Sequence, residues 1–250
     1  MRYTLLDGLR GLTIVSMVIY HAVWDMINIF NIMDDEGWKT ELFIWQQSIC
    51  WSFIFLSGFC SRLGSGSIRR GMQVFLWGAV ISALTIVLMP KNGVLFGVLT
   101  FIGSAMMIVS LCRRLPMQIS PVWGFISSLV LFILLRNTNR GFLGFGSWNL
   151  YPLPDSWYDG MFATYLGFTD GAFSSSDYFS LFTWLFLFLS GYFACSFCKR
   201  RNRMQIFCAA VPSSWQYIGR HSLGLYLLHQ PVIYGVISAW QYVYSYNGTQ

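Results

Sequence analysis

The sequence predicts an all-α fold: a polytopic membrane helical bundle of about seven transmembrane helices, with the N-terminus inside and the C-terminus outside. Three observations lead to this prediction. The composition has too few charges for a water-soluble surface, seven apolar runs are long enough to cross a bilayer, and Lys and Arg are distributed unevenly among the loops between those runs.

The composition excludes a soluble globule. Hydrophobic residues make up 55% of the 250 residues and charged residues only 10%, whereas soluble domains carry about 25% charge. Aromatic residues make up 18%, including 11 Trp, and Trp and Tyr are enriched at both interfaces of a bilayer. The net charge of +6 is what basic cytoplasmic loops produce, so we expect no nucleic-acid partner.

A helix needs about 20 mostly apolar residues to span a bilayer. The run 160–168 is too short for this and is predicted to be re-entrant or interfacial, and the mixed segment 204–218 is predicted to lie along the cytoplasmic surface. We expect residues 1–250 to form a single transmembrane domain with one long outer loop, 137–178. The predicted spans are 11–31, 42–62, 70–89, 94–112, 119–136, 179–198 and 221–243.

The basic residues predict the orientation, because cytoplasmic loops carry an excess of Lys and Arg. With the N-terminus inside, twelve of the 16 basic residues fall on the inner side and four on the outer side. The inner residues are Arg2, Arg10, Arg62, Arg69, Arg70, Arg113, Arg114, Lys199, Arg200, Arg201, Arg203 and Arg220, and the outer ones are Lys39, Lys91, Arg136 and Arg140. An odd number of spans then places the C-terminus outside.

The first span carries ionisable residues, which are costly inside a bilayer and usually functional. At about 100° per residue, Arg10, His21 and Asp25 share one helix face. His21 lies roughly 16 Å beyond Arg10, near the middle of the membrane. Asp25 follows one turn later, where its carboxylate can hydrogen-bond the imidazole and orient a general base. The alternative is an interior histidine satisfied within a packing network.

The last span repeats this pattern. Arg220 and His221 stand at its inner end, and His229 follows roughly 14 Å further along. Pro231 removes a backbone hydrogen bond and frees a carbonyl near His229. His21 and His229 are thus expected at similar depth, where both can face one pocket. A proline kink with His229 satisfied by a neighbouring helix is the alternative.

Other polar residues are weaker signals. Hydroxyl groups such as those of Ser57 and Thr100 commonly join membrane helices, and Asp177 is expected to cap a helix rather than to act in catalysis. Arg10, Arg62 and Arg220 stand at membrane entrances and can also clasp phosphates. No metal site is expected, since a second Cys pair or a His cluster does not accompany the Cys195-x-x-Cys198 spacing.

The first helix resembles the first-helix motif of the transmembrane acyltransferase superfamily, in Leu6-Asp7-Gly8-Leu9-Arg10-Gly11 through His21. Further patches resemble one branch, the heparan-α-glucosaminide N-acetyltransferase-like family of bacterial membrane proteins. They extend to about residue 235 and are Tyr20-His21-x-x-x-Asp25, Phe55-Leu56-Ser57-Gly58, Phe96-Gly97-Val98-Leu99-x-Phe101-Ile102-Gly103, Asp177-Tyr178-Phe179-x-Leu181-Phe182, Ile218-Gly219-Arg220-His221-Ser222-Leu223 and His229-Gln230-Pro231.

This resemblance implies acetyl or acyl transfer from acetyl-CoA or another acyl-CoA to a sugar or glycoconjugate acceptor, in the bacterial cytoplasmic (inner) membrane. His21 matches the essential histidine of the family and Arg10 the arginine of its first helix. The chain departs from the family at Thr100, where histidine is usual, and at Ser180 and Thr183, where proline is usual. A change of activity or substrate is expected if Thr100 replaces a participating histidine.

We therefore predict a membrane-embedded acyltransferase that acts on a hydroxyl or amine of a sugar-like acceptor. His21 is the predicted general base and Asp25 its orienting partner. The residues predicted to bind acyl-CoA or its thioester carbonyl are Arg10, Ser57, Arg220, His229 and Gln230. A transporter or permease with a proton-coupling histidine site is the main alternative, although no inverted repeat is visible. A non-catalytic membrane subunit is another, and a homodimer stays open.

Overall fold

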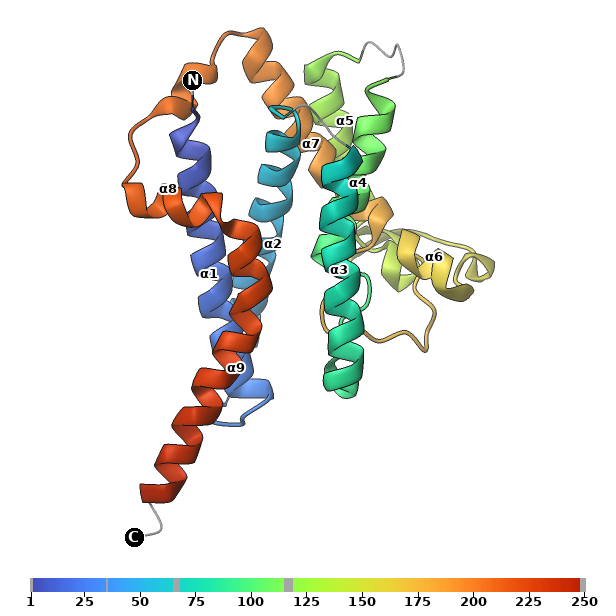
Figure 1. The fold of residues 1–250 in the computed structure, drawn as a ribbon. Coiled ribbons are helices and arrows are strands. Elements are labelled where there is room, and N and C mark those ends of the chain that lie inside the picture. Colours follow the sequence, from blue (N-terminus) through green and yellow to red (C-terminus); the bar gives the residue numbers. More distant parts are fainter. Residues whose placement is uncertain (1, 35, 65–67, 115–118, 248–250) are drawn as a thin grey trace. The chain divides into compact units, whose positions relative to one another are not determined.

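The computed structural model describes residues 2–34, 36–64, 68–114 and 119–247. The described residues form nine α-helices and a two-stranded antiparallel hairpin (Figure 1). The helices are α1 (Thr4–Asn28), α2 (Lys39–Ser61), α3 (Ile68–Leu88), α4 (Val98–Cys112), α5 (Pro121–Leu134), α6 (Gly160–Leu166), α7 (Leu181–Arg200), α8 (Ser213–Arg220) and α9 (Ser222–Asn247), and the strands are β1 (Phe142–Phe145) and β2 (Trp148–Pro152).

The predicted helical membrane fold is confirmed at this level. Among the described residues, five segments are long and apolar enough to cross a membrane: α1, α2, α3, Pro121–Arg140 and α7. Helix α4 is apolar but has only 15 residues. Each of the seven predicted spans coincides with a helix, and the largest difference is at α1, which begins at Thr4 rather than at residue 11. The polar first turns of α1 are therefore helical as well.

The chain divides into two compact units, with one boundary within α2 and the other after α7, between residues 203 and 204. The terminal unit comprises residues 1–53 and 204–250, and the central unit comprises residues 54–203. Each unit has its own packing and is described separately.

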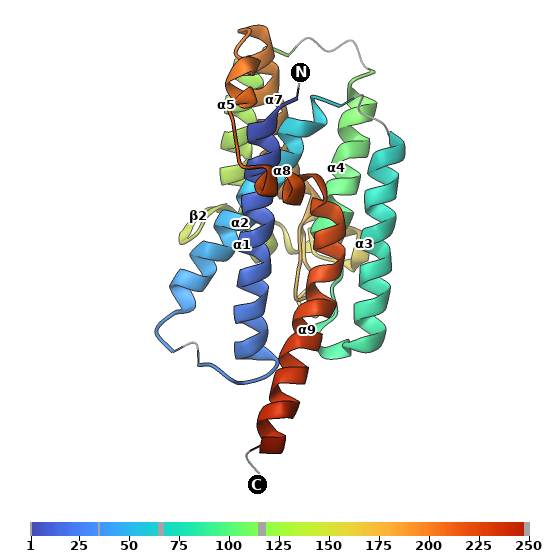
Figure 2. The same ribbon diagram turned by 60° about the vertical axis from the view of Figure 1, so that its left-hand side comes forward.

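The terminal unit is built on α1, which packs against both α8 and α9 (Figures 1 and 2). Three glycines allow the backbone of α8 and of the residues before it to approach α1 closely. A Cβ on Gly11 would collide with the carbonyl oxygen of Trp215, one on Gly219 with the carbonyl oxygen of Asp7, and one on Gly8 would lie 2.6 Å from Val211 Cγ1. Small residues allow this backbone contact, and it fixes the end of α8 against the first turns of α1.

The core of the terminal unit lies one to four turns further along α1. Ile14, Met17 and Tyr20 are buried there with Ile49 of α2. The indole nitrogen of Trp45 donates a hydrogen bond to the Ser16 hydroxyl at 2.8 Å. This apolar cluster fixes the rotation of α1 about its own axis. The side chains that follow Tyr20 therefore point in a defined direction.

The central unit contains two closely packed helix pairs, α3 with α4 and α5 with α7. Glycines again line the contacts. A Cβ on Gly78 would lie 2.6 Å from the Thr100 nitrogen, and one on Gly124 would lie 2.6 Å from the Phe193 ring. Gly58 of α2 meets the backbone of α7 at Phe188 in the same way. The Gly58 and Gly219 of the family-like motifs thus have packing roles.

The segment 137–178, predicted as one long outer loop, is folded in the central unit. It contains the β1–β2 hairpin and α6. The hairpin was not part of the predicted all-α fold. Asn137 organises the hairpin, because its side-chain amide donates to the carbonyl oxygens of Gly146 and Trp148 at 3.1 and 3.2 Å. The Tyr158 hydroxyl donates to the Thr138 carbonyl at 2.6 Å. Period-two alternation is too short here to reveal the strands.

Candidate functional site

The terminal unit brings together polar residues of α1 and α9. The ring centroids of His21 and His229 lie 4.8 Å apart, with the ring planes inclined by 56°. Asp25 lies one turn beyond His21 on α1 and Gln230 directly follows His229 on α9, and the Gln230 side-chain nitrogen lies 2.8 Å from both carboxylate oxygens of Asp25. Four of the predicted site residues, distant in sequence, therefore form one cluster.

The partner of Asp25 differs from the expectation. The carboxylate is fully buried, and in the described part of the chain its side-chain hydrogen bonds come from Gln230 rather than from the His21 imidazole. A buried carboxylate needs donors, and the Gln230 amide supplies them from the facing helix. Asp25 thus links α1 to α9 and fixes the position of His21 through the helices, not by direct contact.

A backbone hydrogen bond sets the tautomer of His229. Its Nδ1 lies 2.5 Å from the carbonyl oxygen of Tyr226. A carbonyl oxygen only accepts hydrogen bonds, so Nδ1 carries a proton, and in the neutral ring Nε2 carries a lone pair. Neutral His229 is therefore suited to accept a proton at Nε2.

Gln230 has one unused group. Its Oε1 is buried and has no hydrogen-bond partner among the described residues, while its nitrogen is committed to Asp25. A buried acceptor without a partner costs about 1–3 kcal/mol. An N–H or O–H group of a bound molecule would remove that cost.

Aromatic rings surround the two histidines. Tyr20 contacts His21 edge-on at 5.7 Å between ring centroids and contacts Trp45 at 5.5 Å. Tyr226 lies 5.4 Å from His229. These rings give the imidazoles an apolar setting in which a proton transfer meets little competition from water.

A second polar cluster lies at the start of α1, around Asp7. The Asp7 carboxylate lies 3.4 Å from the Arg2 guanidinium, 3.9 Å from that of Arg10 and 3.6 Å from that of Arg220. Three cations on one anion leave a local excess of positive charge, and the Arg10 and Arg220 side chains remain about one third exposed. This arrangement suits phosphate groups, which arginine binds well.

Sequence reasoning paired Arg10 with Arg220 but missed Asp7, the carboxylate that joins them. The available signal was its position three residues before Arg10, since residues at i and i+3 are neighbours on a helix. The contact of Gly219 with the Asp7 carbonyl oxygen explains how the arginine that follows reaches the same carboxylate.

Two other singled-out residues belong to the central unit. Ser57 lies half-buried on α2, next to the closely packed Gly58. Asp177 caps a helix, as predicted, but the helix is α4: the Val98 N–H donates to its carboxylate at 3.4 Å. Burial raises the pKa of Asp177 to about 6, and the hydrogen bond from Val98 opposes that rise.

Comparison with known proteins gives one match. A protein-family model described as heparan-alpha-glucosaminide N-acetyltransferase, catalytic, matches residues 2–231. Neither the curated proteins nor the solved structures gave a significant match. The matched range includes the His21–His229 cluster and the cluster around Asp7.

Proposed function

The chain belongs to the heparan-α-glucosaminide N-acetyltransferase catalytic family, and from this premise we propose that it transfers an acetyl or acyl group from acyl-CoA to a hydroxyl or amine of a sugar-like acceptor, with His21 as general base. The observation that carries this proposal is the ring contact between His21 and His229 beside the Asp25–Gln230 pair. A paired, oriented imidazole in an apolar setting is suited to general-base catalysis.

The donor binds along α1. Its phosphates lie against Arg10 and Arg220, whose positive charge Asp7 only partly neutralises. Arg10 precedes His21 by eleven residues, roughly 16 Å along the helix, a distance that an extended pantetheine arm covers. Gln230 Oε1 accepts a hydrogen bond from an amide N–H of that arm, which gives the buried acceptor its partner.

The chemical step is a direct transfer. The acceptor nitrogen or oxygen attacks the thioester carbonyl carbon while His21 removes its proton. The tetrahedral intermediate then collapses, the carbon–sulfur bond breaks, and the CoA thiolate leaves and takes up the proton from His21. The products are the acylated acceptor and free CoA, and no external oxidant or reductant is needed.

His229 assists as a proton acceptor. The sequence predicts that His229 or Ser57 stabilises the thioester carbonyl, which requires His229 to have a donor at Nε2. The Nδ1 hydrogen bond to Tyr226 favours the opposite role in the neutral ring. The rings of His229 and His21 lie 4.8 Å apart between centroids, so His229 can share the proton that His21 removes.

The proposal includes the predicted topology. Seven spans, with α4 and α9 added to the five segments that are long and apolar enough to cross a membrane, leave the N-terminus inside and the C-terminus outside a bacterial cytoplasmic membrane. The family match covers parts of both units, which supports one functional domain over residues 1–250. On this topology the Asp7 cluster faces the cytoplasm, where acyl-CoA is made.

The test compares two histidines of the same unit. His21→Ala should lower acetyl transfer by at least about 100-fold, the loss typical of a missing general base. His221→Ala should keep near-normal transfer, because His221 is exposed and its side-chain contacts within the described residues are with Tyr217 of α8. Both purified variants should bind acetyl-CoA. Unchanged transfer by a folded His21→Ala protein would sink the proposal, and proton-coupled transport by it would favour a permease.

A further inference from the structure

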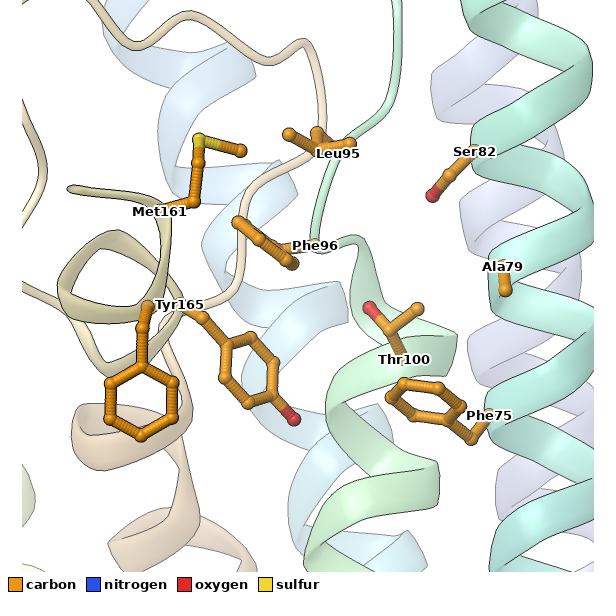
Figure 3. A pocket seen from close by; sticks show the side chains of 9 residues that line it. Phe75, Ala79, Ser82, Leu95, Phe96, Thr100, Met161 and Tyr165 are labelled. Atoms are coloured by element: carbon orange, nitrogen blue, oxygen red, sulfur yellow. The ribbon is translucent and has the colours of Figure 1, made fainter.

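The central unit contains a pocket that the transfer chemistry does not use. Its volume is about 460 Å³, within the range of about 300–1,000 Å³ for small-molecule sites. Helix α3, the start of α4 with the residues before it, and α6 form its walls (Figure 3). The lining residues are Phe75, Ala79, Ser82, Leu95, Phe96, Thr100, Met161, Phe162 and Tyr165.

Three hydroxyl groups line the pocket, those of Ser82, Thr100 and Tyr165, and those of Thr100 and Tyr165 are bonded to other protein groups. The Thr100 hydroxyl donates to the Gly97 carbonyl at 2.6 Å, and the Ser104 hydroxyl donates to the Thr100 carbonyl at 2.8 Å. The Tyr165 hydroxyl donates to the Ser104 hydroxyl, and burial raises the pKa of Tyr165, so this phenol keeps its proton. The pocket therefore offers a ligand almost only carbon, which suits a hydrocarbon chain and not a sugar ring.

One wall residue is held in a strained conformation. Phe96 has a φ of 56°, which lies in the left-handed region that is unfavourable for a residue with a side chain. Its ring lies 5.1 Å from that of Tyr165 between centroids. Such strain persists where the surrounding structure enforces it, and here it directs an aromatic ring onto the pocket.

The pocket is continuous with surfaces that are apolar and exposed. Met161 and Phe162 of α6 are 54% and 75% exposed, and α3 continues past the pocket with exposed Leu84 and Val87. Helix α3 is long and apolar enough to cross a membrane, so in a bilayer the exposed side chains of Leu84 and Val87 can contact lipid. A hydrocarbon chain can then reach the pocket without leaving apolar surroundings.

The position along α4 separates this pocket from the basic residues at the far end of that helix. Thr100 lies near the first turn of α4, and Arg113 follows its last residue, roughly 20 Å away along the helix. Phosphates of an acyl-CoA are drawn to the basic end. A lipid whose head group lies at the opposite end of α4, near Thr100, has its chain at the pocket.

We propose that this pocket binds the hydrocarbon chain of a lipid-linked acceptor. The acceptor is then an amphiphile, and α3, α4 and α6 hold its chain. This inference rests on the proposed transfer function, because it names the class of acceptor. A bilayer phospholipid and the acyl chain of the donor are the rival occupants.

Photolabelling tests occupancy without requiring activity. A dodecyl glucosaminide with a diazirine in its chain is irradiated with the full-length protein in phosphatidylcholine nanodiscs, and adducts are mapped by mass spectrometry. Adducts should gather on the pocket residues and fall at least about tenfold in Ala79→Trp, whose indole fills the pocket, and in Met161→Trp, which fills it from α6. Val87→Trp, on the exposed face of α3, should label normally.

Adducts spread along α3, or unaffected by both filling variants, would overturn the inference. Labelling should be competed by unlabelled dodecyl glucosaminide. With the protein in detergent, equal competition by added phosphatidylcholine would show a bilayer lipid as the occupant, and stronger competition by dodecanoyl-CoA would show the chain of the donor. Either result would contradict the proposal.

A kinetic comparison links the pocket to transfer. Dodecyl and methyl glucosaminide carry the same amine, so only the chain differs. In Ala79→Trp the KM for the dodecyl compound should rise about tenfold while that for the methyl compound stays constant. Equal effects on both would contradict the inference. Transfer to neither, with pocket labelling retained, would count against the proposed function and leave the chain site in place.

Discussion

The His21–His229 cluster of the terminal unit and the apolar pocket of the central unit differ in what they leave unsatisfied. In the first, Gln230 Oε1 is buried without a partner in the described chain, and His229 presents a free lone pair in its neutral form. In the second, the Thr100, Ser104 and Tyr165 hydroxyls are all bonded to protein groups. The histidine cluster is therefore suited to acyl transfer, and the apolar pocket is suited to binding a hydrocarbon chain.

The same difference appears in how glycine is used. Gly11 and Gly219 bring α8 onto α1, which sets Arg220 beside Asp7. Gly78 brings α3 onto Thr100 of α4 and so closes one wall of the pocket. In the terminal unit close packing positions charges, whereas in the central unit it shapes an apolar wall.

The largest effect on stability is expected when a methyl group is added at the close contact between α1 and α8. Gly219→Ala should destabilise the protein by about 2–4 kcal/mol, because its Cβ would collide with the Asp7 carbonyl oxygen and backbone cannot move aside cheaply. Gly224→Ala is the control, since a Cβ there meets nothing within 4 Å. Thermal unfolding in detergent measures both. If the two variants are equally stable, the α1–α8 contact at Gly219 is not what holds Arg220 beside Asp7.

The Asp25–Gln230 pair provides the next effect. Asp25→Asn should lower kcat about tenfold, since its amide would face the Gln230 amide and leave a buried donor unpaired. The swapped pair Asp25→Asn with Gln230→Glu should recover most of that loss, because acid and amide again face each other. A swapped pair as slow as Asp25→Asn would show that the carboxylate is needed on α1, in contact with His21.

The arginines test where the donor phosphates bind. Arg10→Gln and Arg220→Gln should each raise the KM for acetyl-CoA about tenfold with little change in kcat, whereas Arg203→Gln, an exposed arginine, should not. Arg62 of the central unit provides the discriminating comparison, since its guanidinium lies 5.7 Å from the Tyr192 ring centroid. If Arg62→Gln raises the KM and Arg10→Gln does not, the donor binds in the central unit.

The smallest effect concerns pH. Because the pKa of Asp177 is raised to about 6 from 3.8, the folded protein holds a proton there that the unfolded chain has lost. Stability should therefore fall as the pH rises from about 4 to about 6, by at most about 3 kcal/mol. Asp177→Asn should flatten this dependence in thermal unfolding and leave the pH profile of transfer unchanged. An altered transfer profile would give Asp177 a role in the chemistry.

Hydropathy was sufficient to predict the helices, because each predicted span is a long apolar run that only a helix satisfies in lipid. The helix period also placed His21 and Asp25 on one face of α1. The β1–β2 hairpin escaped prediction because its strands have four and five residues and depend on Asn137, which lies outside them.

The partners across helices were not predictable from one sequence. Nothing in the spacing of Asp25 and Gln230 indicates that their side chains meet, because 205 residues separate them. The same holds for Arg220 and Asp7. The pocket was not predicted because most of its lining residues are ordinary apolar residues of three helices and of the segment before α4. Only the arrangement of these elements in the fold forms the cavity.

The central claim is that the acyl group is transferred beside His21. A structure of the protein with a ketone analogue of acetyl-CoA, which cannot release its acyl group, tests it most directly. The account predicts the analogue carbonyl beside the His21 and His229 rings, with phosphates on Arg10 and Arg220. A carbonyl in the pocket lined by Phe96 and Thr100, with phosphates on Arg113, would contradict it.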